Sequence, residues 1–428
     1  MIVKVTSDLA KLRRVIRRRG DYRRMARAAA RRPQVPDDHA RVVLYFADSA
    51  VNLYQVRQWL EPLRRLDEQH PVVVVTRAPD TTLALFDESP FPVVPISTIA
   101  GLERWLGRQQ VAAFFYVNQN RRNFAVMRFA AQAHVFLSHG ESDKAYMASN
   151  QLKAYDRVFV AGPAAVRRIG AHVIDLPPER LVPVGRPQVD VEHAGPVLPD
   201  DGRTVVLYAP TWEGDRPSMA YSSVVSHGAA MLTALVQDER FRVVYRPHPR
   251  TGAVDPAYAR ADRALGALLE DANRRDPSAG HLVDRDTDFG WHVRAADLCV
   301  TDVSAVAFDW LACGRPLVLT QPASLEAVIA PGSLADRLDT LGAVDAPHVV
   351  TQIEKELVGE SADRGQIVAD YFGDTTPGAA MARFLAAADT VVRDRSHALL
   401  ARAQGADHYD HRAPNAGWTG DDRGVTSQ

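Results

Sequence analysis

Cysteine is scarce in this chain, with only Cys299 and Cys313 among its 428 residues. Two thiols are too few for a disulfide framework or for a zinc site built from cysteine ligands. Such sparse use of cysteine is typical of a protein of the cytoplasm, whose fold depends on hydrophobic burial.

Long apolar runs are also missing. No stretch of 18 or more apolar residues occurs in the sequence, whereas a helix that spans a bilayer needs about 20. The N-terminus lacks the uninterrupted apolar segment of a secretory signal peptide. We therefore expect a chain that stays on the cytosolic side of the membrane.

The glycine-rich loops that bind nucleotide phosphates are absent as well. The sequence contains neither Gly-x-Gly-x-x-Gly nor a Gly-Lys-Ser or Gly-Lys-Thr phosphate loop, which argues against a dehydrogenase and a P-loop NTPase. No acidic cluster has an obvious metal-ligand spacing, so we expect neither a metal nor a cofactor. A phosphate would have to be held at a helix N-terminus instead.

Charge is unevenly distributed along the chain. The net charge is −1 overall, yet residues 1–32 contain twelve Lys and Arg against two Asp, a net charge of +10. Leu9, Leu12, Val15 and Ile16 fall on one helical stripe, the pattern of a helix that lies on an anionic membrane surface. A solvated basic helix docked on its own domain explains the same residues, and both interpretations stay open.

The rest of the sequence predicts an α/β fold. With 46% hydrophobic and 24% charged residues, the chain is ordinary globular material, long enough for two or three cores. After Pro36, short apolar runs alternate with amphipathic stretches, as in stacked βαβ units around a parallel sheet. In the first half we expect helices over 53–69 and 123–133 and strands over 42–46, 72–75, 93–96, 112–117, 135–138 and 158–161.

A second βαβ series follows a Pro- and Gly-rich, acidic interval at 182–201, which predicts an interdomain linker. Beyond it we expect strands over 205–208, 243–245, 298–301 and 317–319, and helices over 228–237, 258–272, 305–313, 325–330 and 381–403. The sequence thus predicts two Rossmann-like, doubly wound domains that face a cleft. Its divisions are a basic helical segment at 1–36, domains at 37–190 and 200–372, a C-terminal helix at 373–403 and a disordered tail at 404–428.

Polar loops follow four of the predicted strands. Because ligands of open α/β sheets bind at the carboxyl ends of the strands, we expect the chemistry at these loops. The loops carry, in chain order, His139-Gly140 with Lys144 close behind, Thr211-Trp212, Arg246-Pro247-His248-Pro249-Arg250, and Asp302-Val303-Ser304.

Two histidines in these loops are candidates for the chemistry. His139 directly follows a strand, where an imidazole of near-neutral pKa can serve as a general base, and Lys144 can reach back toward a phosphate. His248 is held between two prolines beside Arg246 and Arg250, which suits a diphosphate. A cis-proline or rigid turn with an incidental histidine is the alternative for this second motif.

Ser304 is the natural N-cap of the helix predicted at 305–313, which Gly314 ends. Its hydroxyl and the N–H groups of Ala305 and Val306 can bind phosphate oxygens. A cap serine is more often only a cap, so the motif alone leaves its role open.

Taken in order, these motifs resemble one family. The segments HGESDK, LYAPTWEG, YRPHP, AADLCVTDVSAVAFDWLACGRPLVL and YFGDTTPGAAMARFL are similar to the motifs of the CDP-glycerol glycerophosphotransferase family, the teichoic-acid polyol-phosphate transferases. The similarity spans residues 133–385, and the ordered set is far more specific than any single motif.

The resemblance implies a glycosyltransferase-B architecture and a transferase of the bacterial cell envelope. A hydroxyl of a lipid-linked or polymeric acceptor, bound by the N-terminal domain, would attack the β-phosphate of a CDP-polyol held mostly by the C-terminal domain, and CMP would leave. The resemblance also implies a peripheral location at the inner membrane face, with no nucleic acid as partner. Matched by position, it implies a general base, His139, a second catalytic histidine on the donor diphosphate, His248, and seven donor-binding residues, Lys144, Thr211, Trp212, Arg246, Asp302, Ser304 and Ala305.

Two departures from the family pattern stand out. The usual Asp-Tyr-Ser-Ser reads Asp302-Val303-Ser304-Ala305 here, which removes one hydroxyl. Small and apolar residues after His-Gly are replaced by Glu141-Ser142-Asp143, and extra negative charge beside a phosphate is unfavourable unless it is compensated. These departures bear on the identity of the donor more than on the fold.

Three other functions fit parts of the pattern. A nucleotide-sugar glycosyltransferase of the same architecture would share the capped helix but release UDP or GDP. A UDP-N-acetylglucosamine 2-epimerase has a similar helix, with consecutive glycines and paired glutamates that residues 304–309 lack. A non-catalytic module of an envelope-assembly complex would keep the fold, but both histidines are intact.

Overall fold

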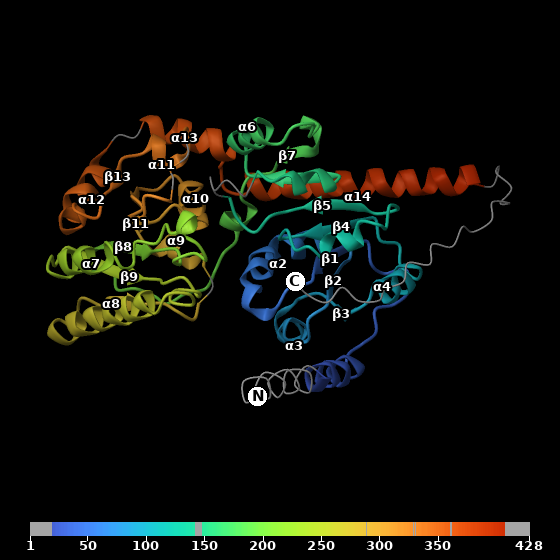
Figure 1. Ribbon diagram of the computed structural model, residues 1–428, viewed down its shortest axis with the longest axis horizontal. Coiled ribbons are helices and arrows are strands. Elements are labelled where there is room, and N and C mark those ends of the chain that lie inside the picture. Colours follow the sequence, from blue (N-terminus) through green and yellow to red (C-terminus); the bar gives the residue numbers. More distant parts are fainter. Residues whose placement is uncertain are drawn as a thin grey trace, which may run out of the picture.

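The chain forms two α/β domains that lie side by side, as the computed structural model shows (Figure 1). The structure describes residues 19–141, 148–287, 289–327, 329, 331–359 and 362–406. The apolar stripe predicted at residues 9–16, Lys144 and the chain beyond residue 406 lie outside the described residues.

The N-terminal domain is built on a seven-stranded parallel sheet with the order β3-β2-β1-β4-β5-β6-β7. Its strands are β1 (Val42–Phe46), β2 (Val72–Thr76), β3 (Val93–Pro95), β4 (Ala113–Tyr116), β5 (Ala133–Phe136), β6 (Arg157–Val160) and β7 (Leu181–Pro183). Runs such as VVLYF in β1 are buried along their whole length, because helices cover both faces of a parallel sheet. The strand order reverses between β1 and β4, where a crevice opens at the carboxyl ends of such a sheet.

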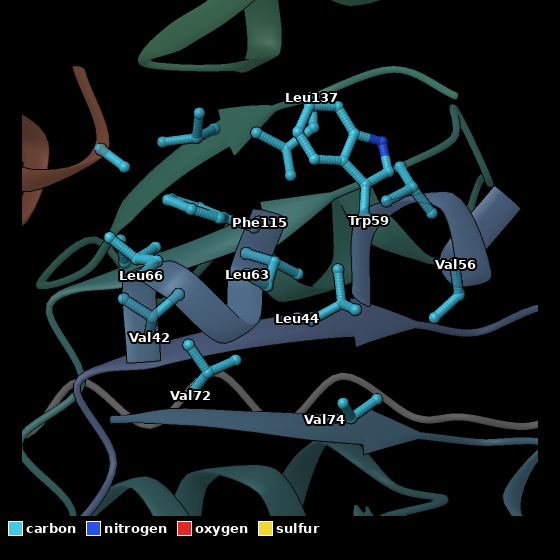
Figure 2. Close-up of a cluster of buried hydrophobic side chains, with 14 of the residues drawn as sticks. Val42, Leu44, Val56, Trp59, Leu63, Leu66, Val72, Val74, Phe115 and Leu137 are labelled. Atoms are coloured by element: carbon cyan, nitrogen blue, oxygen red, sulfur yellow. The ribbon is translucent and has the colours of Figure 1, made fainter. Parts of the chain in front are cut away.

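Helix α2 (Tyr54–Asp67) matters most for the site described below. Its apolar residues recur at spacings of three and four, so they form one stripe that packs onto the sheet. Figure 2 shows this contact, with Val56, Trp59, Leu63 and Leu66 of α2 above Val42, Leu44, Val72 and Val74 of the first two strands. The remaining helices of this domain are α3 (Pro79–Glu88), α4 (Ile99–Leu106), α5 (Asn123–Val126) and α6 (Pro163–His172).

The C-terminal domain repeats the architecture with a six-stranded parallel sheet of order β10-β9-β8-β11-β12-β13. The strands are β8 (Thr204–Ala209), β9 (Phe241–Tyr245), β10 (Leu282–Val283), β11 (Leu298–Thr301), β12 (Leu317–Thr320) and β13 (Thr340–Leu341). The helices are α7 (Gly228–Val236), α8 (Pro256–Arg275), α9 (Trp291–Ala295), α10 (Ala305–Leu311), α11 (Leu334–Arg337), α12 (Val349–Val358) and α13 (Ala362–Phe372). Two doubly wound domains were predicted from the sequence, and this prediction is confirmed.

The last helix, α14 (Ala379–Ala406), returns to the N-terminal domain (Figure 1). Phe384 on α14 is fully buried, and its ring lies 5.2 Å from that of Trp59 between centroids. At the start of α14, the carboxylate of Asp190 accepts hydrogen bonds from the N–H groups of Gly378 and Met381 at 2.9 Å each. The chain therefore crosses between the domains twice, in the linker and before α14.

Residues 19–30 form a basic helix that packs beside α3 (Figure 1). Met25 is buried, and just beyond the helix the guanidinium of Arg32 donates to Asp87 at 3.0 Å and lies 4.5 Å from the centroid of the Phe86 ring. No helix in the described part of the chain combines the length and the apolar character needed to cross a bilayer.

Several predicted boundaries were wrong. The helix expected over 123–133 ends at Val126. Residues 325–327, expected in a helix, form a turn in which the N–H of Ala327 donates to the carbonyl of Ser324 at 3.1 Å. Strands β7, β10 and β13 were not predicted, since they have only two or three residues and lie at the edges of their sheets. Helix α14 extends past the predicted limit at residue 403 to Ala406.

Candidate active site

The two predicted histidines lie on opposite sides of the domain interface, against the same aromatic ring. His139 follows β5 in the N-terminal domain, and His248 follows β9 in the C-terminal domain. Tyr54, the first residue of α2, has its ring centroid 6.2 Å from that of His139 and 6.2 Å from that of His248. The fold therefore brings the two histidines together, as expected for strand-end loops that face a shared cleft.

A hydrogen bond to the backbone helps to orient the ring of His139. Its Nδ1 lies 3.0 Å from the carbonyl oxygen of Val117, at the end of β4. A carbonyl can only accept, so Nδ1 carries the hydrogen and Nε2 is the basic nitrogen. A neutral imidazole in this tautomer is suited to accept a proton at Nε2.

Helix α2 holds the loop around His139 in place. The indole N–H of Trp59 donates to the carbonyl of Ser138 at 2.7 Å, and the amide of Gln58 donates to the carbonyl of His139 at 2.7 Å. Ser138 has a φ of +62° and its hydroxyl donates to the carbonyl of Gly140 at 2.9 Å. A non-glycine residue in this region costs about 1 kcal/mol or more, and such strain is concentrated at functional sites.

His248 has the opposite tautomer. The backbone N–H of Arg250 donates to His248 Nδ1 at 3.0 Å, so in neutral His248 the hydrogen is on Nε2, which is a donor. The ring stacks on Trp212 with centroids 6.4 Å apart, and the Arg250 guanidinium lies 3.7 Å from the centroid of the Trp212 ring. A hydrogen-bond donor backed by a guanidinium suits a phosphate oxygen.

Arg246 does not stand alone beside this histidine. Its Nη1 lies 2.5 Å from Asp284 Oδ2, and the same carboxylate accepts hydrogen bonds from the Thr287 hydroxyl at 2.6 Å and from His292 Nε2 at 2.7 Å. Burial raises the pKa of Asp284, but the Thr287 hydrogen bond and the Arg246 charge outweigh it, so the pKa lies below its usual value. Sequence reasoning missed Asp284 because the two-residue strand before it, β10, gave no signal.

Asp302 was expected to contact a phosphate, but its carboxylate is fully buried. It accepts hydrogen bonds from the N–H of Thr211 at 2.7 Å, the N–H of Ser223 at 3.2 Å and the hydroxyl of Thr320 at 2.6 Å. Burial raises the pKa of Asp302 above its usual value. The carboxylate joins the loops of Thr211 and Ser223 to the end of β12, and this positions the Thr211 loop.

Glu213 was not predicted as a site residue and has a similar part in the second loop. It is buried and accepts hydrogen bonds from the N–H groups of Gly252, Val254 and Asp255 at 2.9, 2.8 and 3.2 Å. Burial raises the pKa of Glu213, but these donors outweigh it, so the pKa is lowered. Glu213 thereby joins the Trp212 loop to the segment that follows His248. The position of Glu213 in the motif, directly after Trp212, was the signal by which the sequence could have pointed to it.

Ser304 occupies the N-cap position of α10, as predicted, but its hydroxyl makes no hydrogen bond to the described first turn of the helix. It lies 3.3 Å from the hydroxyl of Thr301, which donates to the carbonyl of Ala209 at 2.6 Å. The next residue, Ala305, touches the His139 loop, because a Cβ built on Gly140 would come within 2.9 Å of the Ala305 Cβ. The start of α10 and the loop of the base are therefore packed together.

The first acidic residue after Gly140, Glu141, is compensated within the N-terminal domain. Glu141 is buried and forms an ion pair with Arg168 of α6. Its charge is therefore neutralised. Lys144 and its neighbours at 142–147 lie outside the described residues. Within the described ranges, no group of three or more His, Cys, Asp or Glu could hold a metal ion.

Comparison with solved structures identifies proteins of the same fold. The wall teichoic acid polymerase TagF is 12% identical, with a TM-score of 0.53 over 93% of this chain and 99% of that chain. A TagF variant soaked with CDPG is 13% identical, with a TM-score of 0.51 over the same shares. A putative UDP-N-acetylglucosamine 2-epimerase from Listeria monocytogenes is 16% identical, with a TM-score of 0.56 over 83% of this chain and 97% of that chain. These likenesses establish the glycosyltransferase-B type of fold.

A comparison with curated protein sequences finds no match. The family described as CDP-glycerol:poly(glycerophosphate) glycerophosphotransferase, in contrast, has a model that matches residues 112–324. This range begins before β4, ends after β12 and contains all four predicted loops, with both histidines. Residues 112–324 of the chain therefore belong to the CDP-glycerol:poly(glycerophosphate) glycerophosphotransferase family.

Proposed function

We propose that this protein transfers a polyol phosphate from a CDP-linked donor to an acceptor hydroxyl of the cell envelope and releases CMP. Membership of the family gives the reaction class, a CDP-glycerol-dependent transfer of glycerol phosphate. The observation that carries the proposal for this chain is the pair of histidines in opposite tautomers on either side of Tyr54. One histidine is set to accept a proton and the other to donate a hydrogen bond.

The chemistry follows from these two tautomers. His139 Nε2 takes the proton of the acceptor hydroxyl while that oxygen forms a bond to the β-phosphorus of the donor. The bond from this phosphorus to the bridging oxygen breaks, the electron pair stays on that oxygen, and CMP leaves. His139 then returns its proton to solvent. Because phosphoryl transfer runs through a loose transition state, positioning and positive charge supply most of the catalysis.

The other predicted residues have supporting roles in this mechanism. The Nε2 hydrogen of His248 and the guanidinium of Arg246 would contact the diphosphate, with Asp284 holding Arg246 at 2.5 Å. Trp212, whose ring contacts both His248 and Arg250, would form the wall of the donor cleft. Asp302 and Thr211 would position this wall from below. We also assign Lys144 and the start of α10, with Ser304 and Ala305, to the donor, because their motifs resemble those of the family.

The proposal is tested by incubating the purified protein with CDP-glycerol, CDP-ribitol or UDP-sugars and a polyol acceptor, and measuring CMP release. We expect CMP from a CDP-polyol and no UDP from the sugars. His139→Ala should abolish turnover and leave thermal stabilisation by the donor intact. If no CDP-polyol yields CMP or raises the melting temperature, the proposal is wrong, and UDP release would favour a glycosyltransferase.

Substituting His248 separates its role from that of His139. His248→Gln keeps a side-chain N–H donor, whereas His248→Ala removes it. Removing one hydrogen-bond donor that faces charge developing in the transition state lowers kcat roughly 10²- to 10³-fold. The kcat of the Ala variant should therefore fall by about that factor, and the kcat of the Gln variant by less. Equal losses in both variants would show that the hydrogen bond is not what His248 contributes.

We further propose that the basic N-terminal helix holds the protein at an anionic membrane surface, where lipid-linked acceptors lie. In the described part, Arg19, Arg23, Arg24 and Arg27 are exposed while Met25 is buried against the domain. Each basic residue near an anionic surface contributes about 1 kcal/mol. Full-length protein should sediment with phosphatidylglycerol vesicles and not with phosphatidylcholine vesicles. Equal sedimentation after deletion of residues 1–32 would exclude this role.

A further inference from the structure

We propose that Gln58, Arg186 and Asp309 are positioning residues that couple the donor-binding domain to the general base. The proposal rests on the function proposed above for His139. None of the three residues belongs to the predicted site. Together they connect helix α10 of the C-terminal domain with the backbone of His139 through one continuous series of hydrogen bonds.

The first step is a buried ion pair between the domains. Arg186 follows β7, and the short 3-10 segment after it, Pro187–Asp190, packs against α2 and α14 of the N-terminal side. The Nε and Nη2 atoms of Arg186 lie 2.6 and 2.5 Å from Asp309 Oδ1 on α10. The Arg186 side chain is only 5% exposed and that of Asp309 only 14%, so the pair is largely shielded from water.

The second step passes from Arg186 to the base. The Nη2 of Arg186 also donates to Gln58 Oε1 at 3.4 Å, and Gln58 Nε2 donates to the carbonyl of His139 at 2.7 Å. A guanidinium can only donate, so it fixes the Gln58 oxygen on its own side. The Gln58 amide must then direct its N–H groups toward His139, and its orientation is set by the charge across the interface.

Helix α10 thus reaches the base loop at two points. Its first residue, Ala305, is packed against Gly140, and one turn later Asp309 reaches the His139 carbonyl through Arg186 and Gln58. A rotation of the C-terminal domain that breaks the Asp309 contact would free the Gln58 amide to turn. Placing the base within a fraction of an ångström matters, since a misplacement of about 1 Å can cost 10²-fold in rate.

A purely structural role for the ion pair is the competing explanation, because buried pairs hold domains together without any part in chemistry. The chain offers a control for it at a more exposed ion pair. Arg167 on α6 binds Asp370 on α13 at 2.6 Å, which is a second ion pair between the domains, and it makes no described contact with the His139 loop. Variants of the two arginines should therefore differ in catalysis if the inference is right.

The experiment compares Gln58→Met, Arg186→Gln and Arg186→Lys with the control Arg167→Gln in full-length protein. CMP release from CDP-glycerol gives kcat and KM, and calorimetry gives the melting temperature. We expect kcat to fall roughly 10- to 100-fold in the Gln58 and Arg186 variants, with the donor KM within about twofold of the parent. Arg186→Lys keeps the charge but loses the paired N–H donors of the guanidinium, so its kcat should also fall. Arg167→Gln should keep the parental kcat.

A second readout does not depend on turnover. Nitrogen-15 spectra of histidine-labelled protein report the tautomer of each ring, with His139→Ala identifying the signal of His139. The parent should show hydrogen on Nδ1 alone, and Gln58→Met and Arg186→Gln should show a mixture of tautomers. Unchanged His139 signals in these variants, or a loss of kcat no larger than in Arg167→Gln, would overturn the inference. If the parent releases no CMP, the proposed function fails, and the spectra still decide whether Gln58 and Arg186 orient His139.

Discussion

The ring of Tyr54 lies edge-on to both His139 and His248, at interplanar angles of 84° and 79°. Tyr54 belongs to α2 of the N-terminal domain, whereas His248 belongs to the C-terminal domain, so this ring contact crosses the domain interface. Its hydroxyl accepts a hydrogen bond from the Gln55 amide at 3.2 Å. The ring, rather than the hydroxyl, is therefore the part of Tyr54 that relates the two histidines.

Replacing Tyr54 tests this division between ring and hydroxyl. Each edge-on aromatic contact contributes about 0.5–1.5 kcal/mol beyond area burial, so Tyr54→Ala should lower kcat/KM for the donor by roughly tenfold. Tyr54→Phe keeps both ring contacts and should stay within about twofold of the parent in the same assay of CMP release. A large loss in the Phe variant would assign the role to the hydroxyl and contradict the ring interpretation.

Gly140→Ala should slow the reaction by separating the base loop from α10. The new Cβ would lie 2.9 Å from the Cβ of Ala305, closer than side chains tolerate, so one of the two segments must move. We expect kcat to fall at least tenfold, since a shift of the His139 loop misplaces the base.

Gly170→Ala is the matched control for this substitution. Gly170 lies in α6, and none of the described atoms would come within 4 Å of its new Cβ. An alanine in a helix gains about 0.8–1 kcal/mol over glycine, so this variant should melt at a higher temperature with kcat unchanged. Equal kcat in both variants would mean that the Gly140 contact does not position the base.

The sequence predicted the strands and loops of the site because its buried parallel strands are continuous apolar runs. Such runs end in polar residues at the carboxyl edge, and both His139 and His248 could be found in this way. Local patterns also placed Ser304 at the start of a helix, where the structure has it.

Long-range partners could not be predicted in the same way. Gln58 and His139 are 81 residues apart in the chain, and Arg186 and Asp309 are 123 residues apart. Nothing in a local pattern says that a polar residue on one helix meets a given carbonyl. Asp302 illustrates the same limit. Its position at a strand end is local, whereas its carboxylate is bonded by two distant loops and by the end of β12.

Asp302→Asn should destabilise the protein more than it alters the donor site directly. The new amide would point its N–H₂ group at N–H donors that the carboxylate now satisfies. A buried donor left without its acceptor costs about 1–3 kcal/mol, and calorimetry should show a lower melting temperature. The donor KM should rise only as far as the Thr211 loop loosens. An unchanged melting temperature would show that Asp302 does not tie the loops together.

His292 should make the stability of the protein depend on pH. The ring is buried beside Asp284, and burial lowers its pKa from 6.5 to about 4 in the folded chain. Between pH 6.5 and 4 the unfolded chain therefore binds a proton that the folded chain does not. The stabilisation is fully present above pH 6.5 and is lost as the pH falls toward 4, with a magnitude of order 3 kcal/mol.

His281 shares this window, because burial also lowers its pKa from 6.5 to about 4. A His292→Gln variant should therefore lose only part of the pH dependence, and it should be less stable than the parent at pH 7. The measurement is the free energy of unfolding by urea at steps between pH 4 and 7. The difference in the free energy of unfolding between parent and variant should become smaller as the pH falls, since only the parent loses the contribution of His292. A difference in unfolding free energy that stays constant with pH would contradict a neutral, buried His292.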